Sequence, residues 1–449
     1  MKMKICSIIC VICLLLSSTF ALSSCSFDDA AGIVNARINE NGELILIYSD
    51  GNEQNLGVII DKDDTDGSIG KDIENSTNES TGSITITTNG SSIPVASSKG
   101  LRSAVSIVCN FQATVQQGGW RPGSGGTTTK EYSTEGSGVI YKIDKADGDA
   151  FIITNYHVVY DASSNTENGI SNDISVYLYG SEIDEKAIKA TYVGGSLYYD
   201  IAVLRVEDSE ILKESNACAV EIADSDKIAV GDSAIAIGNA QGLGISSTSG
   251  IVSVDSEHIT MTAADGKTEV AFRVMRVDTA INSGNSGGGL YDDEGKLIGI
   301  VNAKIIYDGV ENIGYAIPSN IAVSIAENII YYCHGTDVER VQRALLGITV
   351  STIDSKAVFD SATGLVSIEE TVAVYEVSNN SLAFDILQAE DILISATLNG
   401  STTEITRQYH IIDMMLDVHA GDVVTLNILR NGEEKTVSIT ITEECLSEY

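Results

Sequence analysis

The serine at position 286 lies in a run of glycines, and this pattern is typical of a nucleophile that attacks a carbonyl carbon. Ser286 follows Gly284 and Asn285 and precedes three further glycines, within VDTAINSGNSGGGL at 277–290. Glycines beside a serine let backbone N–H groups approach a substrate carbonyl, because no Cβ stands in the way. Acyl transfer requires such a nucleophile together with N–H donors for the oxyanion. A hydroxyl is a weak nucleophile alone, so this hypothesis also requires a general base and a group that orients the base.

Two other side chains could supply these functions. His157, one of five histidines, follows the apolar run FIIT, where a strand end can hold a side chain rigidly. Asp200 stands at the start of the apolar run IAVLRV, and an acid there is costly to bury unless it is paired. Each residue alone has a simpler interpretation, as a histidine that fills a turn and as a solvated acid. Together they predict a triad in which Asp200 orients His157, and His157 takes the hydroxyl proton of Ser286.

The pentapeptide at 284–288 also matches the G-x-S-x-G pattern of α/β-hydrolases. In that fold the chain order is serine, acid, histidine, and the serine turn leads into a helix. Here the histidine and the acid both precede the serine, and the sequence after it predicts a hairpin with a turn at 292–295. The order and the hairpin favour the chymotrypsin type.

The elements that position these residues are predicted to be mostly strands. The chain of 449 residues has 41 glycines and only three prolines, and short Val- and Ile-rich runs alternate with Gly, Asn and Asp turns between about 98 and 333. Evenly spaced short runs favour β-barrels or sandwiches over βαβ units. A helix is predicted from after Pro318 to about Tyr332, capped by Ser319 or Asn320. The predicted fold class is therefore mainly β.

Residues 98–333 resemble the trypsin-like serine proteases of the HtrA (Deg) family. The resemblance depends on six motifs in the family's order: GSGVI, TNYHVV, DIAVLRV, GDSAIAIGNAQGLGISSTSGIVS, VDTAINSGNSGGGL and IGYAIPSN. It implies a chymotrypsin-like double β-barrel followed by a small α+β domain. It also implies that His157, Asp200 and Ser286 are the catalytic residues, and that the N–H groups of Gly284 and Ser286 form the oxyanion hole.

The residues near the serine predict the P1 preference. Ala280 lies six residues before Ser286, where trypsin-type enzymes that select basic P1 residues carry an acid. The predicted S1 pocket is apolar and is lined by Ala280, Ile281, Val301, Asn302 and Ala303. We therefore expect cleavage after small or medium aliphatic residues, and not after Lys or Arg.

Residues 343–445 predict a second domain, with strands and a helical pattern at 409–418. This segment resembles the PDZ domain that the family usually carries, which implies binding of extended C-termini by β-augmentation. The loop that would cap a ligand's carboxylate consists of Leu345, Leu346, Gly347 and Ile348. Two positions depart from the family's pattern, with Leu382 in place of proline and Glu390 in place of glycine. The alternative is a PDZ-like domain that only packs against the protease.

The N-terminal residues predict export. Two lysines precede an apolar run at 5–16, which is too short to span a membrane. Leu22 to Cys25 resembles the lipobox of bacterial lipoproteins. The resemblance implies that residues 1–24 are a signal peptide, and that lipid on Cys25 anchors the mature chain to a membrane of the bacterial cell envelope, outside the cytoplasm. The alternative is a plain secretory signal that is cleaved nearby.

Two segments follow the predicted signal peptide. Residues 25–60 contain a predicted β-meander with turns at 41–42 and 50–51. Residues 61–97 are rich in Asp, Ser, Thr, Asn and Gly, which predicts a flexible linker. The linker includes DKDDTDG, but Lys62 stands at the first ligand position of the calcium-loop motif, so no metal site is predicted.

The charge of the chain narrows the choice of partners. The net charge of −36 argues against a nucleic-acid partner.

Beyond the predicted signal peptide and lipid site, widely separated cysteines remain at Cys109, Cys218, Cys333 and Cys445. Isolated cysteines of this kind are more often small buried hydrophobes than disulfides, although the sequence leaves their pairing open.

The sequence thus predicts an exported serine endopeptidase that degrades unfolded or misfolded proteins and needs no cofactor. The family resemblance also implies a homotrimer. Two alternatives from other classes stay open. One is an envelope chaperone or peptide-binding protein that keeps the fold without efficient catalysis, and the other is a structural surface lipoprotein. The presence of all three triad residues favours the enzyme.

Overall fold

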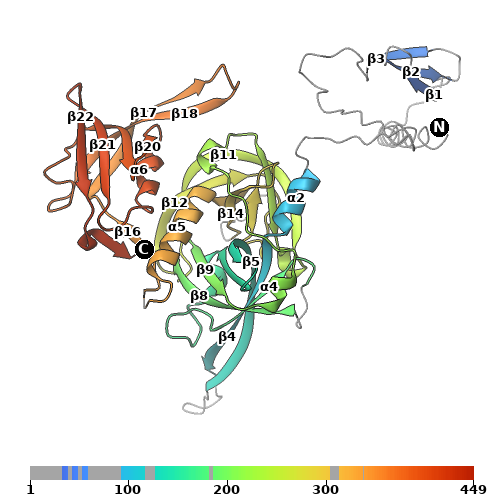
Figure 1. Ribbon diagram of the computed structural model, residues 1–449, viewed down its shortest axis with the longest axis horizontal. Coiled ribbons are helices and arrows are strands. Elements are labelled where there is room, and N and C mark those ends of the chain that lie inside the picture. The colour runs from blue at the N-terminus through green and yellow to red at the C-terminus, as the bar shows by residue number, and fades with distance from the viewer. Residues whose placement is uncertain are drawn as a thin grey trace. The chain divides into compact units, whose positions relative to one another are not determined.

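The computed structural model describes the backbone of three strands near the N-terminus and, from residue 93 to 448, everything except 117–126, 182–185, 304–312 and 337. The chain divides into two compact units, residues 1–90 and 91–449 (Figure 1). In the first unit β1 (Ile33–Ile38), β2 (Glu43–Tyr48) and β3 (Glu53–Val58) form an antiparallel meander, as predicted. The predicted signal peptide and Cys25 lie outside the described residues.

The second unit begins with helix α2 (Ile93–Leu101). Residues 93–97 were predicted to belong to the linker, and here the structure differs. Ala96 and Gly100, four residues apart, are both buried, which gives this segment one face that packs on the protein. A Cβ at Gly100 would lie 2.6 Å from Ile237 Cδ1, so the helix axis comes very close to the neighbouring barrel.

The first barrel is closed by six strands in the order β4-β5-β6-β9-β8-β7. The strands are β4 (Ala104–Gln116), β5 (Thr127–Asp144), β6 (Asp149–Thr154), β7 (Asp173–Leu178), β8 (Ile188–Ser196) and β9 (Ile201–Val206). Its interior is aliphatic, with Ile107, Ile140 and Leu204 fully buried. Two short helices lie outside the strands, α3 (Tyr156–Val159) and α4 (Glu210–Glu214).

The second barrel is also closed by six strands, in the order β10-β11-β12-β15-β14-β13. The strands are β10 (Ser233–Gly238), β11 (Ser246–Thr262), β12 (Glu269–Val277), β13 (Gly289–Tyr291), β14 (Leu297–Val301) and β15 (Gly314–Pro318). Helix α5 (Ser319–Tyr332) follows over the predicted range, but the predicted cap is wrong: the N-cap is Pro318, without a side-chain hydrogen bond, and the hydroxyl of Ser319 donates to the carbonyl of Ala223 instead. Its buried residues Ile321, Ile325 and Ile329 belong to one hydrophobic core with residues of both barrels, so the helix helps to hold the barrels together.

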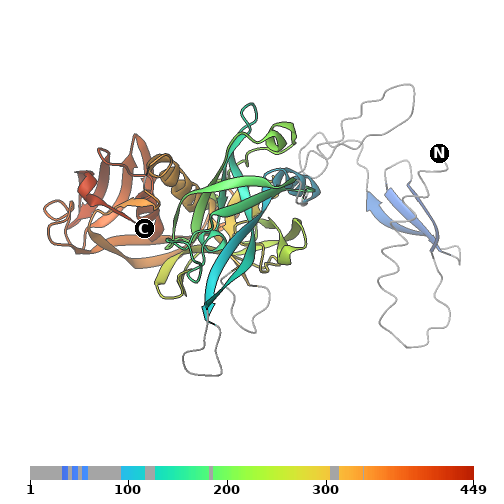
Figure 2. The same ribbon diagram turned by 90° about the horizontal axis from the view of Figure 1, so that it is seen from below.

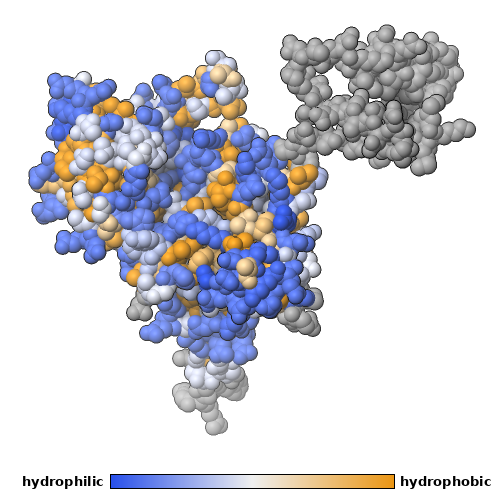
Figure 3. Space-filling view, in the orientation of Figure 1, coloured by the Kyte–Doolittle hydropathy of each residue, from blue (hydrophilic) through white to orange (hydrophobic). Residues whose placement is uncertain are grey.

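The C-terminal domain is built on a separate sheet (Figures 1 and 2). Its strands are β17 (Ile348–Phe359), β18 (Val366–Val377), β19 (Ile392–Leu398), β21 (Val423–Arg430) and β22 (Glu433–Thr440), with β20 (Ser401–Glu404) paired to β19. A small sheet pairs β16 (Gln342–Ala344) with β23 (Leu446–Glu448). Strand β17 lies at an edge of the larger sheet. The hairpin of β17 and β18 projects from the domain and carries exposed apolar side chains, among hydrophilic ones on this face (Figure 3).

Helix α6 (Gln408–Met414) is shorter than the predicted helical pattern at 409–418. The N–H of Leu416 bonds to the carbonyl of Asp413, three residues back, so the α-helical ladder ends in a tight turn. Val418 is fully buried and Leu416 nearly so. The apolar residues after Met414 thus pack into the core without continuing the helix.

The four cysteines at 109, 218, 333 and 445 are free, and those at 109 and 333 are buried, in line with small buried hydrophobes at these two positions. No helix in the described part of the chain is both long and apolar enough to cross a membrane. Among the same residues, no cluster of His, Cys, Asp and Glu could hold a metal ion.

Candidate active site

His157 lies in the short helix α3, directly after strand β6 of the first barrel. Its ring nitrogen Nδ1 is 2.6 Å from Oδ2 of Asp200, and its backbone N–H donates to Oδ1 of the same carboxylate at 2.9 Å. These two contacts fix both the backbone and the ring of His157 relative to the acid. Because Nδ1 faces Asp200, Nε2 is the nitrogen left to exchange a proton with a nucleophile.

Asp200 stands just before strand β9, in a backbone conformation that non-glycine residues seldom adopt. Its φ is +54°, in the left-handed region, which Asp tolerates better than most residues. Its carbonyl accepts hydrogen bonds from the N–H of Tyr156 at 3.1 Å and from the side-chain amide of Asn155 at 2.8 Å. These donors lie one residue and two residues before His157, so the backbone of the acid is bonded directly to the turn that carries the base.

The carboxylate of Asp200 has a further donor. Nδ2 of Asn302, at the end of β14 in the second barrel, donates to Oδ2 at 2.8 Å. Asp200 is buried, and an acid excluded from water needs such donors. Asn302 was predicted to line the S1 pocket, but the structure gives its fully buried side chain this other contact.

Ser286 comes from the loop between β12 and β13 of the second barrel, and 5% of its surface is exposed. Its hydroxyl oxygen accepts a hydrogen bond from the backbone N–H of Ala303 at 3.2 Å. In the described part of the chain, no hydrogen bond joins this oxygen to His157. Catalytic hydrogen bonds often tighten only when substrate binds. Rotation about χ1 between staggered positions is the motion that would redirect the hydroxyl.

The backbone beside Ser286 has the features of an oxyanion hole. The N–H groups of Gly284 and Ser286 bond to no acceptor among the described residues. Gly284 has a φ of +93°, and a Cβ there would lie 2.2 Å from the carbonyl oxygen of Asn239. Gly287 has a φ of +82°. Both the conformation and the space therefore require glycine at these positions.

The other residues predicted for the S1 pocket are Ala280 and Ile281 in this loop, and Val301 and Ala303 at the end of β14 and after it. Val301 is fully buried in a small apolar core, against which the half-buried Ile281 packs. Ala280 is exposed, and its carbonyl accepts a hydrogen bond from the hydroxyl of Thr248 at 3.0 Å. Ala303 is buried and donates to Ser286 through its backbone. The side chains of Ala280, Ile281, Val301 and Ala303 are thus apolar and carry no charge that could bind a basic P1 residue.

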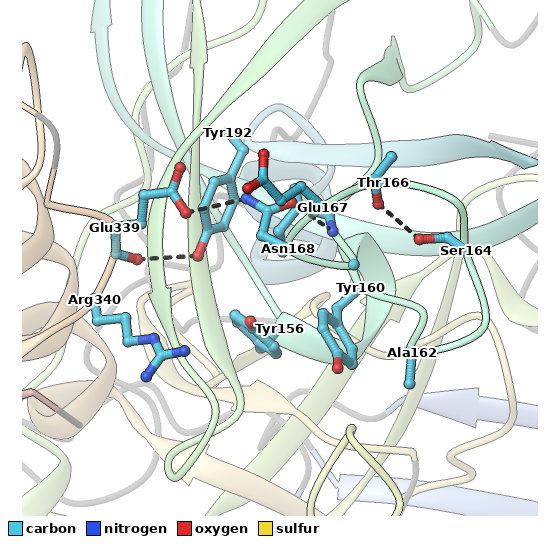
Figure 4. A pocket seen from close by; sticks show the side chains of 12 residues that line it. Tyr156, Tyr160, Ala162, Ser164, Thr166, Glu167, Asn168, Tyr192, Glu339 and Arg340 are labelled. Carbon is cyan, nitrogen blue, oxygen red and sulfur yellow. Dashed lines mark hydrogen bonds between the residues drawn. The ribbon is translucent and has the colours of Figure 1, made fainter.

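A polar pocket lies beside the turn that carries His157 (Figure 4). Tyr156 and Tyr192 line it from the barrel, and Glu339 lines it from the segment that joins the barrels to the C-terminal domain. The hydroxyl of Tyr192 donates to the carbonyl of Glu339 at 3.2 Å, and the amide of Asn168 donates to the carboxylate at 3.0 Å. The backbone N–H of Gly195 on β8 donates to the same carbonyl at 3.0 Å. These three hydrogen bonds to Glu339 therefore hold the connecting segment beside the turn that carries His157.

In the C-terminal domain, the predicted carboxylate-binding loop borders an apolar groove between β17 and α6. The groove is lined by Leu345, Leu346, Gly347 and Ile348 of the loop and, from α6 and its end, by Ile411, Ile412 and Met415. Gly347 has a φ of +78°, and a Cβ there would lie 2.1 Å from the Cβ of Ser381. The loop thus requires glycine at this position.

The unusual Glu390 also has a structural consequence. Its φ is +72°, a conformation that glycine adopts easily and glutamate does not. The next residue, Asp391, is fully buried and receives both Nε and a terminal nitrogen of Arg430, at 2.7 and 2.5 Å. This bidentate pair fixes Asp391 and so supports the strained backbone at Glu390.

Asn155 was not predicted to have a role in the site, and Asn302 was predicted only to line the S1 pocket. Asn155 lies in TNYHVV, two residues before His157, and this proximity could have indicated a role for Asn155 in the site. Asn302 is separated from its partner Asp200 by 102 residues. No local sequence pattern predicts a contact between residues so far apart in the chain.

Two closed six-stranded barrels, with the serine on one and the histidine and acid on the other, define a trypsin-like serine peptidase. A family model described as a trypsin-like peptidase domain matches residues 136–300. The chain is 34% identical over 351 residues to the serine protease Do-like HtrA of Bacillus subtilis (strain 168), which covers 77% of this chain and 71% of the relative. The chain therefore belongs to the HtrA family and is a serine endopeptidase.

Another relative is the periplasmic serine endoprotease DegP of Escherichia coli (strain K12). It is 30% identical over 332 residues, which cover 74% of this chain and 62% of DegP. Among solved structures, that of the HtrA-type protease AlgW with a decapeptide is 24% identical, with a TM-score of 0.49. That match covers 80% of this chain and 99% of AlgW.

Proposed function

We propose that this endopeptidase degrades unfolded or misfolded proteins at the cell envelope, with His157, Asp200 and Ser286 as its catalytic triad. The observation that supports this most is the double contact of His157 with Asp200, at 2.6 Å through Nδ1 and at 2.9 Å through the backbone N–H. It fixes which ring nitrogen faces away from the acid. A histidine that only filled a turn would not need both contacts.

The proposed reaction is acyl transfer in two steps. Oγ of Ser286 forms a bond to the carbonyl carbon of the substrate while its proton passes to Nε2 of His157. The N–H groups of Gly284 and Ser286 stabilise the oxyanion, at about 3 kcal/mol for each donor. The C–N bond then breaks and the proton on Nε2 passes to the leaving amine. Water hydrolyses the acyl-enzyme by the same sequence, with His157 again as base and then as acid.

We also propose that the S1 pocket selects small or medium aliphatic side chains. The apolar character of Ile281 and Val301, and the absence of an acid at Ala280, support this preference. Burial of an aliphatic P1 side chain is favourable, whereas a lysine or arginine would lose its hydration with no counter-charge.

The C-terminal domain is proposed to act as a PDZ domain that binds the C-termini of substrates. Strand β17 is an edge strand, so its free backbone groups are suited to pair with an extended peptide. The groove between β17 and α6 is apolar, and the loop around Gly347 lies at its end. A domain that only packs against the protease would need no such groove.

The location and the assembly of the chain are proposed by analogy with the family. We propose that the chain is exported, anchored through lipid on Cys25, and assembled as a homotrimer. The relative DegP is named as periplasmic. Metabolic labelling with a fatty-acid probe, compared between wild type and Cys25→Ser, tests the anchor, and sedimentation of the purified protein tests the trimer.

The enzymatic proposal is tested with a fluorophosphonate probe and with casein. Wild type should be labelled and should degrade casein, and Ser286→Ala should do neither. Ser283→Ala, three residues away in the same loop, is the matched control and should keep both activities. If the wild type prevents aggregation of an unfolded protein but neither reacts with the probe nor degrades casein, the alternative of a catalytically silent chaperone holds.

A further inference from the structure

The GSGVI motif contains a buried serine to which the proposed mechanism gives no role. Ser137 lies on β5 of the first barrel and is fully buried. We propose that Ser137 is a positioning residue that holds the oxyanion hole of the second barrel in its active shape. This inference rests on the proposed function of Ser286 as nucleophile.

Ser137 contacts the nucleophile loop through both its side chain and its backbone. Its hydroxyl donates to the carbonyl oxygen of Gly284 at 2.7 Å, and its backbone N–H donates to the carbonyl oxygen of Ser286 at 2.8 Å. The hydroxyl oxygen also accepts from the backbone N–H of Asn239 at 2.8 Å. One residue of the first barrel thus holds two carbonyl groups of the second, on either side of Asn285.

These contacts restrict the oxyanion donors because each peptide unit is planar. The carbonyl of Gly284 shares its plane with the N–H of Asn285, which bonds to Asn282 at 3.0 Å. The carbonyl of Ser286 shares its plane with the N–H of Gly287, which bonds to Val301 at 3.0 Å. Each of these two peptide planes is therefore held by one hydrogen bond to its carbonyl and by another from its N–H. The plane between them carries the N–H of Ser286, so this donor has little freedom to turn away from the oxyanion.

The other donor of the oxyanion hole, the N–H of Gly284, is held by contacts that also lead to the hydroxyl of Ser137. The plane that carries the N–H of Gly284 also carries the carbonyl of Ser283, which accepts from the N–H of Gln241 at 2.7 Å. Gln241 follows Asn239 by two residues, and the hydroxyl of Ser137 accepts from the N–H of Asn239. The segment that orients the first donor is thus attached to Ser137 as well.

The close approach of Ser137 leaves little or no room for a side chain at three neighbouring glycines. A Cβ on Gly238 would lie 2.8 Å from Oγ of Ser137. A Cβ on Gly287 would lie 2.2 Å from the carbonyl oxygen of Ser137. A Cβ on Gly288 would lie 3.2 Å from the Cβ of Ser137. The glycine-rich sequence around Ser286 therefore serves more than substrate access, because it also lets the two barrels meet at Ser137.

Removal of the hydroxyl should disturb catalysis more than folding. In Ser137→Ala the carbonyl of Gly284 and the N–H of Asn239 would lose their partner in a place that a water molecule cannot fill. Loss of an oxyanion donor typically costs about 10²–10³ in kcat, and a misplacement of about 1 Å can cost about 10², so a donor that is only partly displaced should cost less. We therefore expect kcat on a peptide substrate to fall about 10- to 100-fold, while KM changes less than about threefold because ground-state contacts are retained.

The matched control is Ser106→Ala. Ser106 is a buried serine on β4 whose hydroxyl accepts from the side chain of the same Asn239 at 2.8 Å. Among the described residues, no hydrogen bond joins its hydroxyl to the nucleophile loop, so kcat should stay within about twofold of wild type.

A second measurement separates positioning from a loss of folded protein. A peptide trifluoromethyl ketone forms an oxyanion on the enzyme, whereas the product peptide with the same sequence does not. Ser137→Ala should weaken inhibition by the ketone by the same factor as kcat and should leave inhibition by the product peptide unchanged. Equal weakening of both inhibitors, or a kcat within twofold of wild type, would overturn the inference.

If Ser137→Ala does not fold, Ser137→Cys provides the same test. Its thiol fills the space but is a weak donor, so the ketone should again lose affinity while the product peptide does not. The reaction with the fluorophosphonate probe keeps the two proposals apart. No labelling of wild type contradicts the proposed triad, whereas equal labelling rates of wild type and Ser137→Ala contradict only the role of Ser137.

Discussion

The guanidinium of Arg273, on strand β12 of the second barrel, lies 2.9 Å from the carboxylate of Asp413 on helix α6 of the C-terminal domain. Only 2% of the Arg273 side chain is exposed, and its guanidinium carbon also lies 3.7 Å from the ring centre of Tyr409. Helix α6 lines the apolar groove with Ile411 and Ile412. Helix α6 thus contacts the protease through Tyr409 and Asp413, whereas Ile411 and Ile412 line the groove that a bound peptide would occupy.

The ionisation of Asp413 should make this interface pH-dependent. Burial, together with the nearby carboxylate of Asp226, raises the pKa of Asp413 to about 6, although Arg273 and Arg343 act in the opposite direction. The contact with Arg273 is close, but Oδ2 of Asp413 lacks the geometry of a hydrogen bond. The folded chain therefore binds a proton more tightly here than the unfolded chain, whose pKa is near 3.8. The stability from this group is present below about pH 4 and is lost as the pH rises through 6.

We predict that Asp413→Asn removes this dependence. The neutral side chain should raise the free energy of unfolding at pH 7.5 by up to about 2 kcal/mol and should change it little at pH 4.5. Thermal melts at the two pH values measure the difference. Asp422→Asn, in the same domain but away from Arg273, is the control. A lower melting temperature of Asp413→Asn at pH 7.5 would show that attraction to Arg273 outweighs the cost of burying the charge.

Asn302 should influence the reaction through Asp200. Asn302→Ala removes the amide that donates to Oδ2 at 2.8 Å, and a hydrogen bond to a charged group contributes about 1.5–3 kcal/mol. We expect kcat/KM to fall roughly 10-fold or more, because the carboxylate that orients His157 loses a hydrogen-bond donor. Asn302→Ser keeps a donor and should restore part of the activity. An unchanged kcat/KM for Asn302→Ala would contradict a role of Asn302 in holding Asp200.

The P1 preference is testable with a panel of peptides that differ only at P1. Wild type should cleave after Val or Ala at least about 10-fold faster than after Lys or Arg, because the pocket offers a basic side chain no counter-charge. Ala280→Asp should improve cleavage after Lys and Arg, and Ala280→Ser is the neutral control. Fastest cleavage after Lys by the wild type would refute the proposed pocket.

Peptide binding by the C-terminal domain is best measured on full-length Ser286→Ala, which cannot consume the ligand. A peptide with a free, aliphatic C-terminus should bind, and its C-terminal amide should bind at least about 10-fold more weakly, because the loop around Gly347 is expected to receive a carboxylate. Titration followed by fluorescence anisotropy gives both constants. Equal affinities, or no binding of either peptide, would favour a domain that only packs against the protease.

The reaction class and the main elements follow from local sequence signals. The order of His157, Asp200 and Ser286 excluded the other hydrolase fold, because chain order is a property of the sequence itself. The strands of the meander and the range of helix α5 were also predicted correctly, since hydrophobic periodicity acts over a few residues. The helix at 93–97 was missed because its stability comes from the burial of Ala96 and Gly100 against a distant strand.

The tertiary structure decided what supports the predicted residues. Asn302 contacts Asp200 across 102 residues, and Ser137 contacts Gly284 across 147. Such pairs form only when each barrel closes in a particular register and the two barrels meet, and neither event leaves a pattern in the local sequence. The sequence by itself therefore determined which side chains could carry out peptide hydrolysis. Barrel closure decided which buried groups hold them, and the packing of Arg273 on α6 decided how the C-terminal domain is joined to the protease.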